Sequence, residues 1–480
     1  MKLKDLLNDI EFECLHGDLN LEVNNLQFDS RKVQAGDVFV ATVGVHVDGH
    51  DYIDKAIELG AKAVVVERDV QVNAVVVKTS NSAAVLPRMA SNFYGNPSAQ
   101  LKVVGVTGTN GKTTIATVLY KLFMSLGYKV GLISTIKYYV GEEEYPSTHT
   151  TPDALQIQKL MHQMLETGCT HCFMEVSSHA IHQDRVKAID FDGGIFTNIT
   201  HDHLDYHKTF AEYIKAKKKF FDDLSPKAFA LTNVDDKNGL VMLQNTLAKR
   251  KTYGLKSVAD YKCKVVEKHI DGMLLQVDNL EVWTHFSGIF NAYNLLAVYV
   301  TALLLGEEQQ EVLAALSALT PVAGRFDIVR SADGKFAIVD YAHTPDALQN
   351  VLNGIREVKR AEQRIITVVG CGGDRDKTKR PIMAKEAMAL SDKVILTSDN
   401  PRTELPSAII ADMEAGVTAE DRAHALSIEN RKEAIRTACM LAQSGDIILI
   451  AGKGHEDYQE VNGVKHHFDD KEVVSEIFNN

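Results

Sequence analysis

Residues 107–114, TGTNGKTT, carry the glycine, lysine and threonine pattern of a loop that binds nucleotide phosphate. Glycines let the backbone fold closely around phosphate oxygens, and the N–H groups of the loop and of the following helix N-terminus face the anion. Lys112 can reach the outer phosphates, and Thr113 can bind Mg²⁺. The strict pattern would place its first glycine at position 106, where this chain has Val106. The expected contacts are Gly108, Thr109, Asn110, Gly111, Lys112, Thr113 and Thr114.

Acids and histidines follow two apolar strand-like runs. Glu175 ends the first run, in MEVSSHAIHQDRV (174–186). The second run, in FTNITHDHLDYH (196–207), is followed by His201, Asp202, His203 and Asp205. Such groups near a phosphate loop can bind Mg²⁺ or position water. A solvated loop is the alternative, and the spacing is not a strong zinc signature.

Residues 210–224, FAEYIKAKKKFFDDL, have the spacing of an amphipathic helix, and Lys217 falls on its apolar face. A lysine on a buried face is costly unless it is paired or loses its proton. A neutral amine could react with CO₂ to give a carbamate, an anion able to bind a metal. Alternatively, Lys217 reaches water along its apolar stem, and periodicity alone does not separate the two readings. The apolar face carries Phe210, Tyr213, Ile214, Phe220, Phe221 and Leu224.

Apolar strands that alternate with helices position these groups, so we expect a mostly parallel, doubly wound α/β fold. A chain of 480 residues is too long for one core. Three blocks are expected: 1–98 with short strands, 99–325 opening with a strand, the glycine loop and a helix, and 326–480 with a Rossmann-like alternation. Strands of the last block end in DYAHTPD, GCGGDRD, SDNPR and GKGHED, which predicts a site at that edge.

Composition narrows the class of protein. A net charge of −12 argues against a nucleic-acid or anionic-membrane surface. The N-terminal residues carry acids where a signal peptide needs an apolar run, and the longest apolar stretch is about half a membrane span. We therefore expect a cytoplasmic protein, and as a separate expectation a monomer. Six cysteines do not make a disulfide framework, and the single CxxC, Cys169 and Cys172, predicts buried thiols.

In content and order, ten segments of the chain resemble those of the Mur ligases of peptidoglycan synthesis, and most of all the diaminopimelate-adding MurE type. They are GVTGTNGKTT, EVSSHAIHQDRV, TNITHDHLDYH, the helix with Lys217, FNAYNLLA, GRFD, DYAHTPDAL, GCGGDRDKTKRP, SDNPR and AGKGHEDYQ. The resemblance covers nearly the whole chain, and Val106 is normal for that family. It implies that residues 1–98 bind the uridine end of the substrate, 99–325 hold ATP and Mg²⁺, and 326–480 bring in the amino acid.

The resemblance also implies a reaction. ATP would phosphorylate the D-Glu side-chain carboxylate of UDP-MurNAc-L-Ala-D-Glu, and the amine of meso-2,6-diaminopimelate would attack the acyl phosphate to give a tetrahedral intermediate. Thr113 and Glu175 would help bind one Mg²⁺, and His203 with carbamylated Lys217 would hold a second. The implied catalytic residues are Lys112, Glu175, His203, Lys217 and His343. The implied ATP contacts outside the loop are Asn291, Asn294, Arg325 and Asp340.

Two more sets of contacts follow from the resemblance. The nucleotide-sugar substrate would contact Ser30, Val45, His46, Val47, Thr150, Thr151, Ser177, Gln183 and Arg185. The amino acid would contact Arg375, Asp399, Asn400, Pro401, Arg402, Gly452 and Glu456. The guanidinium of Arg402 suits the distal carboxylate of diaminopimelate and would repel the ammonium head of L-lysine.

Other functions stay open at this point. The same ligase could use L-lysine or another diamine, and loss of Arg402 would have favoured that. A folylpolyglutamate synthetase should lack the uridine block and the DNPR loop. A P-loop NTPase would hydrolyse ATP without an acyl acceptor. A binding-only relative is disfavoured by the intact Lys112, Glu175, His203 and Lys217.

Overall fold

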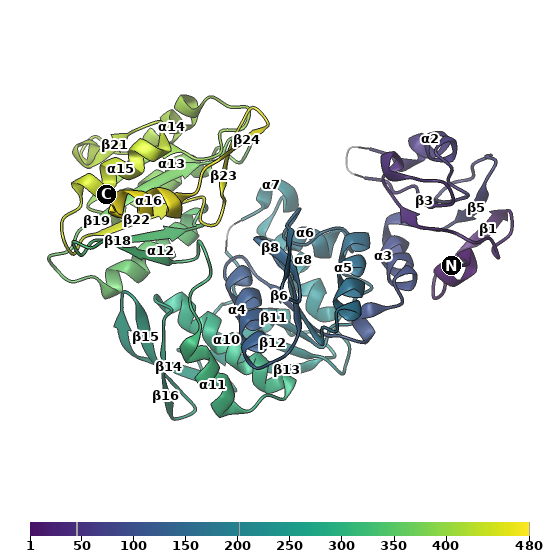
Figure 1. Cartoon of the computed structure of the whole chain (residues 1–480), viewed down its shortest axis with the longest axis horizontal. Coiled ribbons are helices and arrows are strands. Elements are labelled where there is room, and N and C mark those ends of the chain that lie inside the picture. The colour runs from purple at the N-terminus through teal and green to yellow at the C-terminus, as the bar shows by residue number, and fades with distance from the viewer. Residues whose placement is uncertain (45–46, 201, 480) are drawn as a thin grey trace.

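The structure is a computed structural model that describes residues 1–44, 47–200 and 202–479, and only the backbone at 204 and 205. Three sheets follow one another along the chain (Figure 1). The N-terminal unit stands at one side of the central sheet and the C-terminal unit lies on the other side, above α10 (Ile289–Leu305). The expected α/β architecture is therefore confirmed.

The first sheet is small and mostly parallel, with the order β1-β5-β4-β3-β2. Its three inner strands are the valine-rich runs expected from sequence. Among them, β4 has four successive buried apolar residues, as a parallel strand covered on both faces requires. Helix α3 leads from this sheet to the central unit and packs on α5. The bounds are α1 Leu3–Leu6, β1 Glu13–His16, β2 Leu26–Gln27, η1 Ser30–Lys32, β3 Val38–Val40, η2 Gly49–Tyr52, α2 Ile53–Glu58, β4 Ala63–Val66, β5 Val75–Lys78, α3 Ser82–Phe93 and η3 Pro97–Ala99.

The central sheet has the order β16-β15-β14-β13-β12-β11-β6-β10-β7-β8-β9 over the described residues. Strands from β14 to β7 run parallel, and helices pack on both faces. The bounds are β6 Lys102–Thr107, α4 Lys112–Ser125, β7 Val130–Ile133, β8 Lys137–Val140, β9 Glu143–Pro146, α5 Ala154–Glu166, β10 His171–Glu175, α6 Ser178–His182, β11 Gly193–Phe196, α7 Leu204–His207, α8 Phe210–Asp222, β12 Phe229–Asn233, α9 Gly239–Met242, β13 Lys249–Gly254, β14 Tyr261–His269, β15 Gly272–Val277, β16 Leu280–Thr284 and α11 Gln309–Ala318.

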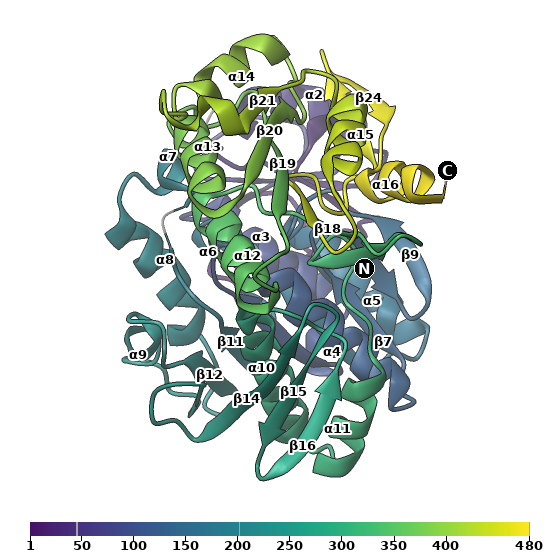
Figure 2. The same cartoon turned by 90° about the vertical axis from the view of Figure 1, so that its left-hand side faces the viewer.

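Both edges of the central sheet differ from a simple strand–helix alternation. Strands β14, β15 and β16 form an antiparallel meander at one edge, and β7, β8 and β9 form another at the opposite edge. The first meander protrudes below the C-terminal unit in Figure 2. Short turns such as Asp278–Asn279, both with positive φ, connect these strands directly, so a helix is not needed.

The third sheet has the order β17-β18-β22-β19-β20-β21, and all but β17 run parallel. The four strands expected from sequence lie side by side, with their carboxyl ends at one edge. A separate hairpin of β23 and β24 follows. The bounds are β17 Asp327–Arg330, β18 Phe336–Asp340, α12 Pro345–Val358, β19 Ile365–Cys371, α13 Lys379–Leu390, β20 Lys393–Ser398, α14 Pro406–Glu414, η4 Asp421–His424, β21 Ala425–Ser427, α15 Arg431–Leu441, β22 Ile447–Ala451, β23 Tyr458–Val461, β24 Val464–His467 and α16 Asp470–Asn479.

The cysteines of the CxxC pair and the apolar helices were also considered from composition. Cys169 and Cys172 are buried free thiols at the start of β10. Among the described residues, no helix combines the length and the apolar character that crossing a membrane requires.

Candidate active site

The glycine loop lies at the carboxyl end of β6, between β10 and β11. Glu175 at the end of β10 is level with Val106, and Phe196 at the end of β11 is level with Thr107. Because neighbouring parallel strands end at the same edge, the loop, Glu175 and the segment after β11 meet there. Sequence reasoning expected this meeting from two separate motifs.

Side chains after β11 hold the loop in shape. Asn198 Oδ1 accepts from the N–H of Asn110 at 2.9 Å, and the Asn198 carbonyl accepts from the N–H of Thr109 at 2.8 Å. Gly111 has a φ of +89°, and a Cβ there would come within 2.6 Å of Asn294 Oδ1. Only glycine fits that conformation and that approach at low cost. The loop is therefore built before any ligand binds.

Two lysines donate to the same carbonyl oxygen of the loop. Lys112 Nζ lies 3.0 Å from the Gly108 oxygen, and Lys217 Nζ lies 2.8 Å from it. Lys112 also donates to the Thr109 carbonyl at 2.8 Å. Burial lowers the pKa of Lys112, and burial together with the Lys112 charge brings the pKa of Lys217 well below its usual range. The structure thus places Lys217 beside the phosphate loop in a setting that favours its neutral amine.

Helix α8 positions Lys217 as its amphipathic spacing predicted. Tyr213, Phe220 and Phe221 are buried, and Lys217 is only 1% exposed. Because the side chain is buried, and because no carboxylate of the described residues lies at salt-bridge distance, the snorkelling alternative is wrong. Its ammonium instead lies 4.8 Å from the centre of the Tyr213 ring. The Tyr213 hydroxyl in turn lies 3.1 Å from Thr109 Oγ1, which ties the helix to the loop.

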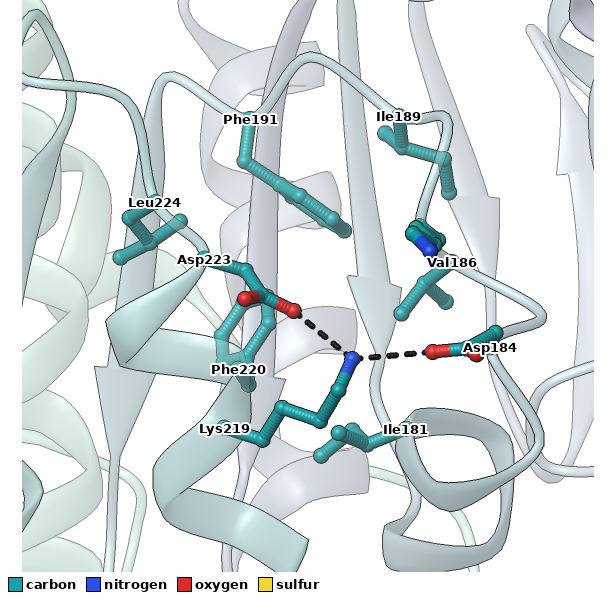
Figure 3. Close-up of a pocket in the computed structure, with 10 residues that line it drawn as sticks. Ile181, Asp184, Val186, Ile189, Phe191, Lys219, Phe220, Asp223 and Leu224 are labelled. Atoms are coloured by element: carbon teal, nitrogen blue, oxygen red, sulfur yellow. Dashed lines mark hydrogen bonds and ion pairs between the residues drawn. The ribbon is translucent and has the colours of Figure 1, made fainter. Parts of the chain in front are cut away.

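A different face of α8 is fixed by charge. Lys219 Nζ donates to Asp223 at 2.8 Å and to Asp184 at 2.9 Å (Figure 3). The cavity beside this bridge holds about 30 Å³, roughly one water molecule, and is too small for a substrate. The bridge is therefore structural and keeps α8 against the segment after α6.

Glu175 is fully buried, and its two carboxylate oxygens differ in their partners. Its Oε1 accepts from the Thr135 N–H at 2.7 Å, whereas its Oε2 has no hydrogen-bond partner among the residues that the structure describes. A buried carboxylate oxygen left unpaired is costly unless a cation binds it. Thr113 is the second residue of α4, and its hydroxyl accepts from Arg325 at 3.3 Å. These two oxygens fit a hard divalent cation.

The remaining predicted metal residues are less closely grouped. His203 has a φ of +55°, and its Nε2 lies 3.5 Å from Asp202 Oδ2. Its ring stands 4.9 Å from that of His179. His201 lies outside the described residues. Within the part of the chain that the structure describes, no three His, Cys, Asp or Glu side chains form a metal-binding group.

The nucleotide side combines α10 with the start of the C-terminal unit. Asn294 donates to Asn291 at 3.1 Å, and both are buried at the start of α10. The Arg325 guanidinium covers the Tyr341 ring at 4.4 Å. Asp340 accepts from the backbone N–H groups of Phe326 and Ala342, and burial raises its pKa to about 6. Thr114 is buried in α4, and His343 lies beside Tyr341, with ring centres 4.6 Å apart.

Five of the predicted nucleotide-sugar contacts form one network. Arg185 donates to the Thr151 carbonyl at 2.8 Å and to Gln183 Oε1 at 3.0 Å. Thr151 Oγ1 accepts from the Ser177 N–H at 3.0 Å and donates to the Glu175 carbonyl at 2.8 Å. Thr150 is joined through Thr135, whose hydroxyl donates to it at 3.0 Å.

The N-terminal contacts lie apart from this network. Ser30 is buried at the start of η1, and Val47 is exposed. Val45 and His46 lie outside the described residues.

The predicted amino-acid contacts gather at the carboxyl edge of the third sheet. Arg402, with a φ of +53°, donates from Nη1 to the Gly373 carbonyl at 2.7 Å. Its backbone is paired with the β23–β24 hairpin, through the Glu460 oxygen at 3.0 Å and the Asn462 N–H at 2.7 Å. Glu460 also stands 3.6 Å from Arg402 Nε. Arg375 is exposed, and its side chain flanks Gly372 together with that of Arg402.

The other contacts are buried, apart from the partly exposed Glu456. Asn400 donates to Glu456 at 2.7 Å, and Pro401 is buried after it. Asp399 accepts from the Asn400 N–H at 2.6 Å. Gly452 approaches Asp399 so closely that a Cβ there would lie 2.6 Å from its carboxylate. Sequence reasoning brought all these residues to one edge, and the structure agrees.

Three residues of this region were missed from sequence. Asn198 shapes the phosphate loop, Lys453 lies under the amino-acid contacts, and Asp346 joins the two larger units. Asp346 Oδ2 accepts from Asn110 Nδ2 at 2.8 Å and from the Thr200 hydroxyl at 3.1 Å. All three stand in the quoted motifs, so proximity to a motif was the available signal.

Comparison with known proteins shows which proteins this chain is similar to. The chain is 57% identical over 483 residues to the UDP-N-acetylmuramoyl-L-alanyl-D-glutamate–2,6-diaminopimelate ligase of Phocaeicola vulgatus, covering 100% of both chains. It is 58% identical to the ligase of the same name from Parabacteroides distasonis, covering 100% of this chain and 99% of the other. The chain belongs to the Mur ligase family.

Three Mur ligase domain descriptions and a solved structure agree with that assignment. The Mur ligase family catalytic domain matches residues 22–94, the Mur ligase middle domain 106–302, and the Mur ligase glutamate ligase domain 324–454. A solved UDP-N-acetylmuramoyl-L-alanyl-D-glutamate–2,6-diaminopimelate ligase superposes with a TM-score of 0.70 at 32% identity, covering 100% of this chain and 99% of that one. The phosphate loop, Glu175 and Lys217 lie in the middle domain of this Mur ligase, and Arg402 lies in the third.

Proposed function

We infer that this Mur ligase joins meso-2,6-diaminopimelate to UDP-N-acetylmuramoyl-L-alanyl-D-glutamate at the expense of ATP, as a step of peptidoglycan precursor synthesis. The single observation that carries this function is the identity of 57% over the full chain to a ligase of that name. The geometry supplies groups that such a ligase needs: a formed phosphate loop, the Glu175 oxygen that has no partner among the described residues, and Arg402 at the carboxyl edge of the third sheet.

The acceptor is a carboxylate, which is a poor electrophile until it is phosphorylated. ATP transfers its terminal phosphoryl group to the D-Glu side-chain carboxylate, releasing ADP. The amine of the incoming amino acid then attacks the acyl phosphate, and the tetrahedral intermediate expels phosphate as the amide forms. Lys112 and the N–H groups of the loop offset the repulsion between the two anions as they approach.

We propose that Thr113 and Glu175 hold Mg²⁺, with His203 and a modified Lys217 serving a second ion. The unpartnered Glu175 Oε2 and the Thr113 hydroxyl are hard oxygen donors that fit the ion. When bound, Mg²⁺ would neutralise phosphate charge and polarise the transferring phosphoryl group. Thr135 fixes the other Glu175 oxygen, so the carboxylate stays oriented without a ligand.

We further propose that Lys217 carries a CO₂-derived carbamate. Its burial and the neighbouring Lys112 charge favour the neutral amine, which can attack CO₂: an N–C bond forms and the nitrogen releases a proton. The product is an anion beside Lys112, so the repulsion between two ammonium groups becomes an attraction. His343, next to Tyr341 and Arg325, completes the proposed catalytic group on the side of the C-terminal unit.

The binding roles divide among the three units in this proposal. Ser30 and the 45–47 segment bind the uridine end, and the Arg185–Thr151 network binds the muramoyl dipeptide. The loop with Asn291, Asn294, Arg325 and Asp340 binds ATP. Arg375, Asp399, Asn400, Pro401, Arg402, Gly452 and Glu456 bind the amino acid. We also expect a cytoplasmic monomer, because ATP and a soluble nucleotide-linked precursor are the substrates.

Arg402 argues for diaminopimelate over L-lysine. Its guanidinium is held by the Gly373 carbonyl and stands near Glu460, so it is oriented before the amino acid binds. A distal carboxylate would pair with it, whereas the ammonium head of L-lysine would be repelled. The alternative, the same ligase acting on L-lysine or another diamino acid, is tested by the same assay.

The deciding experiment measures phosphate release from Mg-ATP with UDP-MurNAc-L-Ala-D-Glu and meso-diaminopimelate, L-lysine or no amino acid. We expect release with diaminopimelate and only background release in the other two arms. Release with L-lysine would retain the ligase and overturn the role of Arg402. Release without either acceptor or amine would overturn the ligase in favour of an NTPase.

A further inference from the structure

The ammonium group of Lys453 is buried directly beneath the proposed amino-acid site. Lys453 follows β22 and is 0% exposed. Its Nζ lies 3.2 Å from Asn400 Oδ1 and 3.2 Å from Glu456 Oε2, and it also donates to the Tyr458 carbonyl. One cation therefore joins the loop after β20, the loop after β22 and the first residue of the hairpin.

Its two side-chain partners are joined to each other as well. Asn400 Nδ2 donates to Glu456 Oε2 at 2.7 Å, and Asn400 Oδ1 accepts from the Glu460 N–H at 2.9 Å. These bonds fix which end of the Asn400 amide carries oxygen. They also occupy Glu456 Oε2, whereas Glu456 Oε1 has no protein donor among the described residues. The carboxylate is thus held by one oxygen and presents the other.

Burying an ammonium group has a high desolvation cost. Taking it from water costs several kcal/mol, and an apolar side chain of similar volume would pack there without that cost. The ion pair with Glu456 offsets part of the cost, but buried pairs often contribute little net stability. The charge therefore points to a task at the site rather than to stability alone.

The surroundings of Glu456 show what that task is. Burial and the neighbouring Asp399 raise the pKa of Glu456, whereas Lys453 lowers it. The other ionisable groups that face this carboxylate are Arg431, Tyr341 and Tyr458. Without Lys453, the proton-bound form of Glu456 would persist to higher pH, and a neutral acid binds an ammonium group poorly.

We propose that Lys453 is a positioning residue of the amino-acid site, which orients Asn400 and keeps Glu456 anionic so that it can bind an ammonium group of the incoming diamino acid. The inference rests on the proposed function, because that function makes Asn400 and Glu456 substrate contacts. Lys453 itself lies under these two side chains and acts through them.

The test compares Lys453→Met and Lys453→Gln with the wild-type chain in the phosphate-release assay from pH 6.5 to 8.5. Both variants remove the charge, and glutamine keeps a hydrogen-bond donor for the Tyr458 carbonyl. We expect the KM for meso-diaminopimelate to rise roughly tenfold or more, as for loss of a charged hydrogen bond, with the KM for ATP within about twofold. The rise should grow as the pH falls, because Glu456 then takes up a proton.

Controls separate this role from a structural one. Lys432→Met removes an exposed lysine of the same unit and should leave every constant unchanged. Lys453→Arg keeps the charge and should show little pH dependence in the KM for diaminopimelate. In a Glu456→Gln background, which has no carboxylate to titrate, Lys453→Gln should add no pH dependence.

Two results would overturn the proposal. One is an unchanged KM for diaminopimelate in a folded Lys453→Gln chain, and the other is an equal, pH-independent loss for ATP and diaminopimelate. If Lys453→Met does not fold, the glutamine and arginine variants decide by the same criteria. A wild-type chain that shows no diaminopimelate-dependent release would instead contradict the proposed function itself.

Discussion

Lys217 and Lys112 place two amine groups on one carbonyl oxygen at the centre of the nucleotide site. Both Nζ atoms lie within 3.0 Å of the Gly108 oxygen. Two ammonium groups that contact the same oxygen repel each other, and burial removes the water that would screen their charges. One of the two amines is therefore driven towards its neutral form, and the fully buried Lys217 carries the larger shift.

Lys217→Ala should abolish most of the ligase activity, and Lys217→Arg should not restore it. A guanidinium stays charged and cannot form the carbamate, so it leaves two cations at the Gly108 oxygen. Phosphate release with all substrates present measures the effect. Lys215→Ala, on the exposed face of α8, is the matched control and should keep full activity. High activity in Lys217→Ala would remove the carbamate from the mechanism.

For single residues, the sequence predicts the helix face on which a side chain lies better than the distant side chains that it contacts. Lys217 could be found because the helical period puts one charge on an apolar face. Lys453 also stands in a quoted motif, but the pattern GKGHE does not reveal that its ammonium faces Asn400, fifty-three positions earlier in the loop after β20. A contact between distant segments depends on sheet order, which one sequence leaves undetermined.

Helices α15 and α16 meet through a buried ion pair under the amino-acid loops. Arg431 begins α15 and Asp470 begins α16; both side chains are fully buried and bond at 2.7 Å through two nitrogens and two oxygens. Arg431 also donates to the carbonyls of Ser398 and Ala451, the last residues of β20 and β22. One guanidinium therefore fixes two helix ends and two strand ends.

Arg431→Met should lower the free energy of unfolding by about 3–5 kcal/mol, because it leaves the Asp470 carboxylate buried without a partner. Denaturant unfolding followed by circular dichroism measures the change. Lys432→Met, at the next and exposed position of α15, should stay within about 0.5 kcal/mol of the wild type. Equal unfolding midpoints for the two variants would show that the pair contributes nothing.

The strands of the third unit were predictable and the meander β14–β16 was not. Runs such as KVILTS and DIILIA are apolar on both faces, as buried parallel strands must be. Strand β14, YKCKVVEKH, carries exposed charges on one face and resembles a surface helix or loop in composition. It is a strand because its backbone pairs with β15, and this pairing between separate segments cannot be read from the residue types of β14 alone.

Asp346 joins the C-terminal unit to the phosphate loop of the central unit. It stands at the start of α12 and accepts from Asn110 and Thr200 of the central unit. Burial raises its pKa, and the two hydrogen bonds counter that effect. Together with the contact between Arg325 and Thr113, these bonds hold the two units around the nucleotide site.

Asp346→Ala should favour a more open arrangement of the two units and raise the KM for ATP. Two lost hydrogen bonds of about 1 kcal/mol each shift the equilibrium by roughly thirtyfold. Small-angle X-ray scattering should show a larger radius of gyration than the wild type, and steady-state kinetics should show the higher KM. Asp333→Ala, in an exposed turn, is the control. Identical scattering curves and KM values would exclude this role for Asp346.

The pairing of Arg402 with hairpin β23–β24 has a consequence for how substrate choice can change during evolution. The bonded groups Asn400 and Glu460 are sixty positions apart in the chain. In the role proposed for Arg402, a chimaera that receives only the DNPR loop of a relative would inherit this arginine without the hairpin backbone that shapes the loop. Under that proposal, selectivity is a trait of two co-inherited segments, and a lineage that switches amino acid must alter both in step.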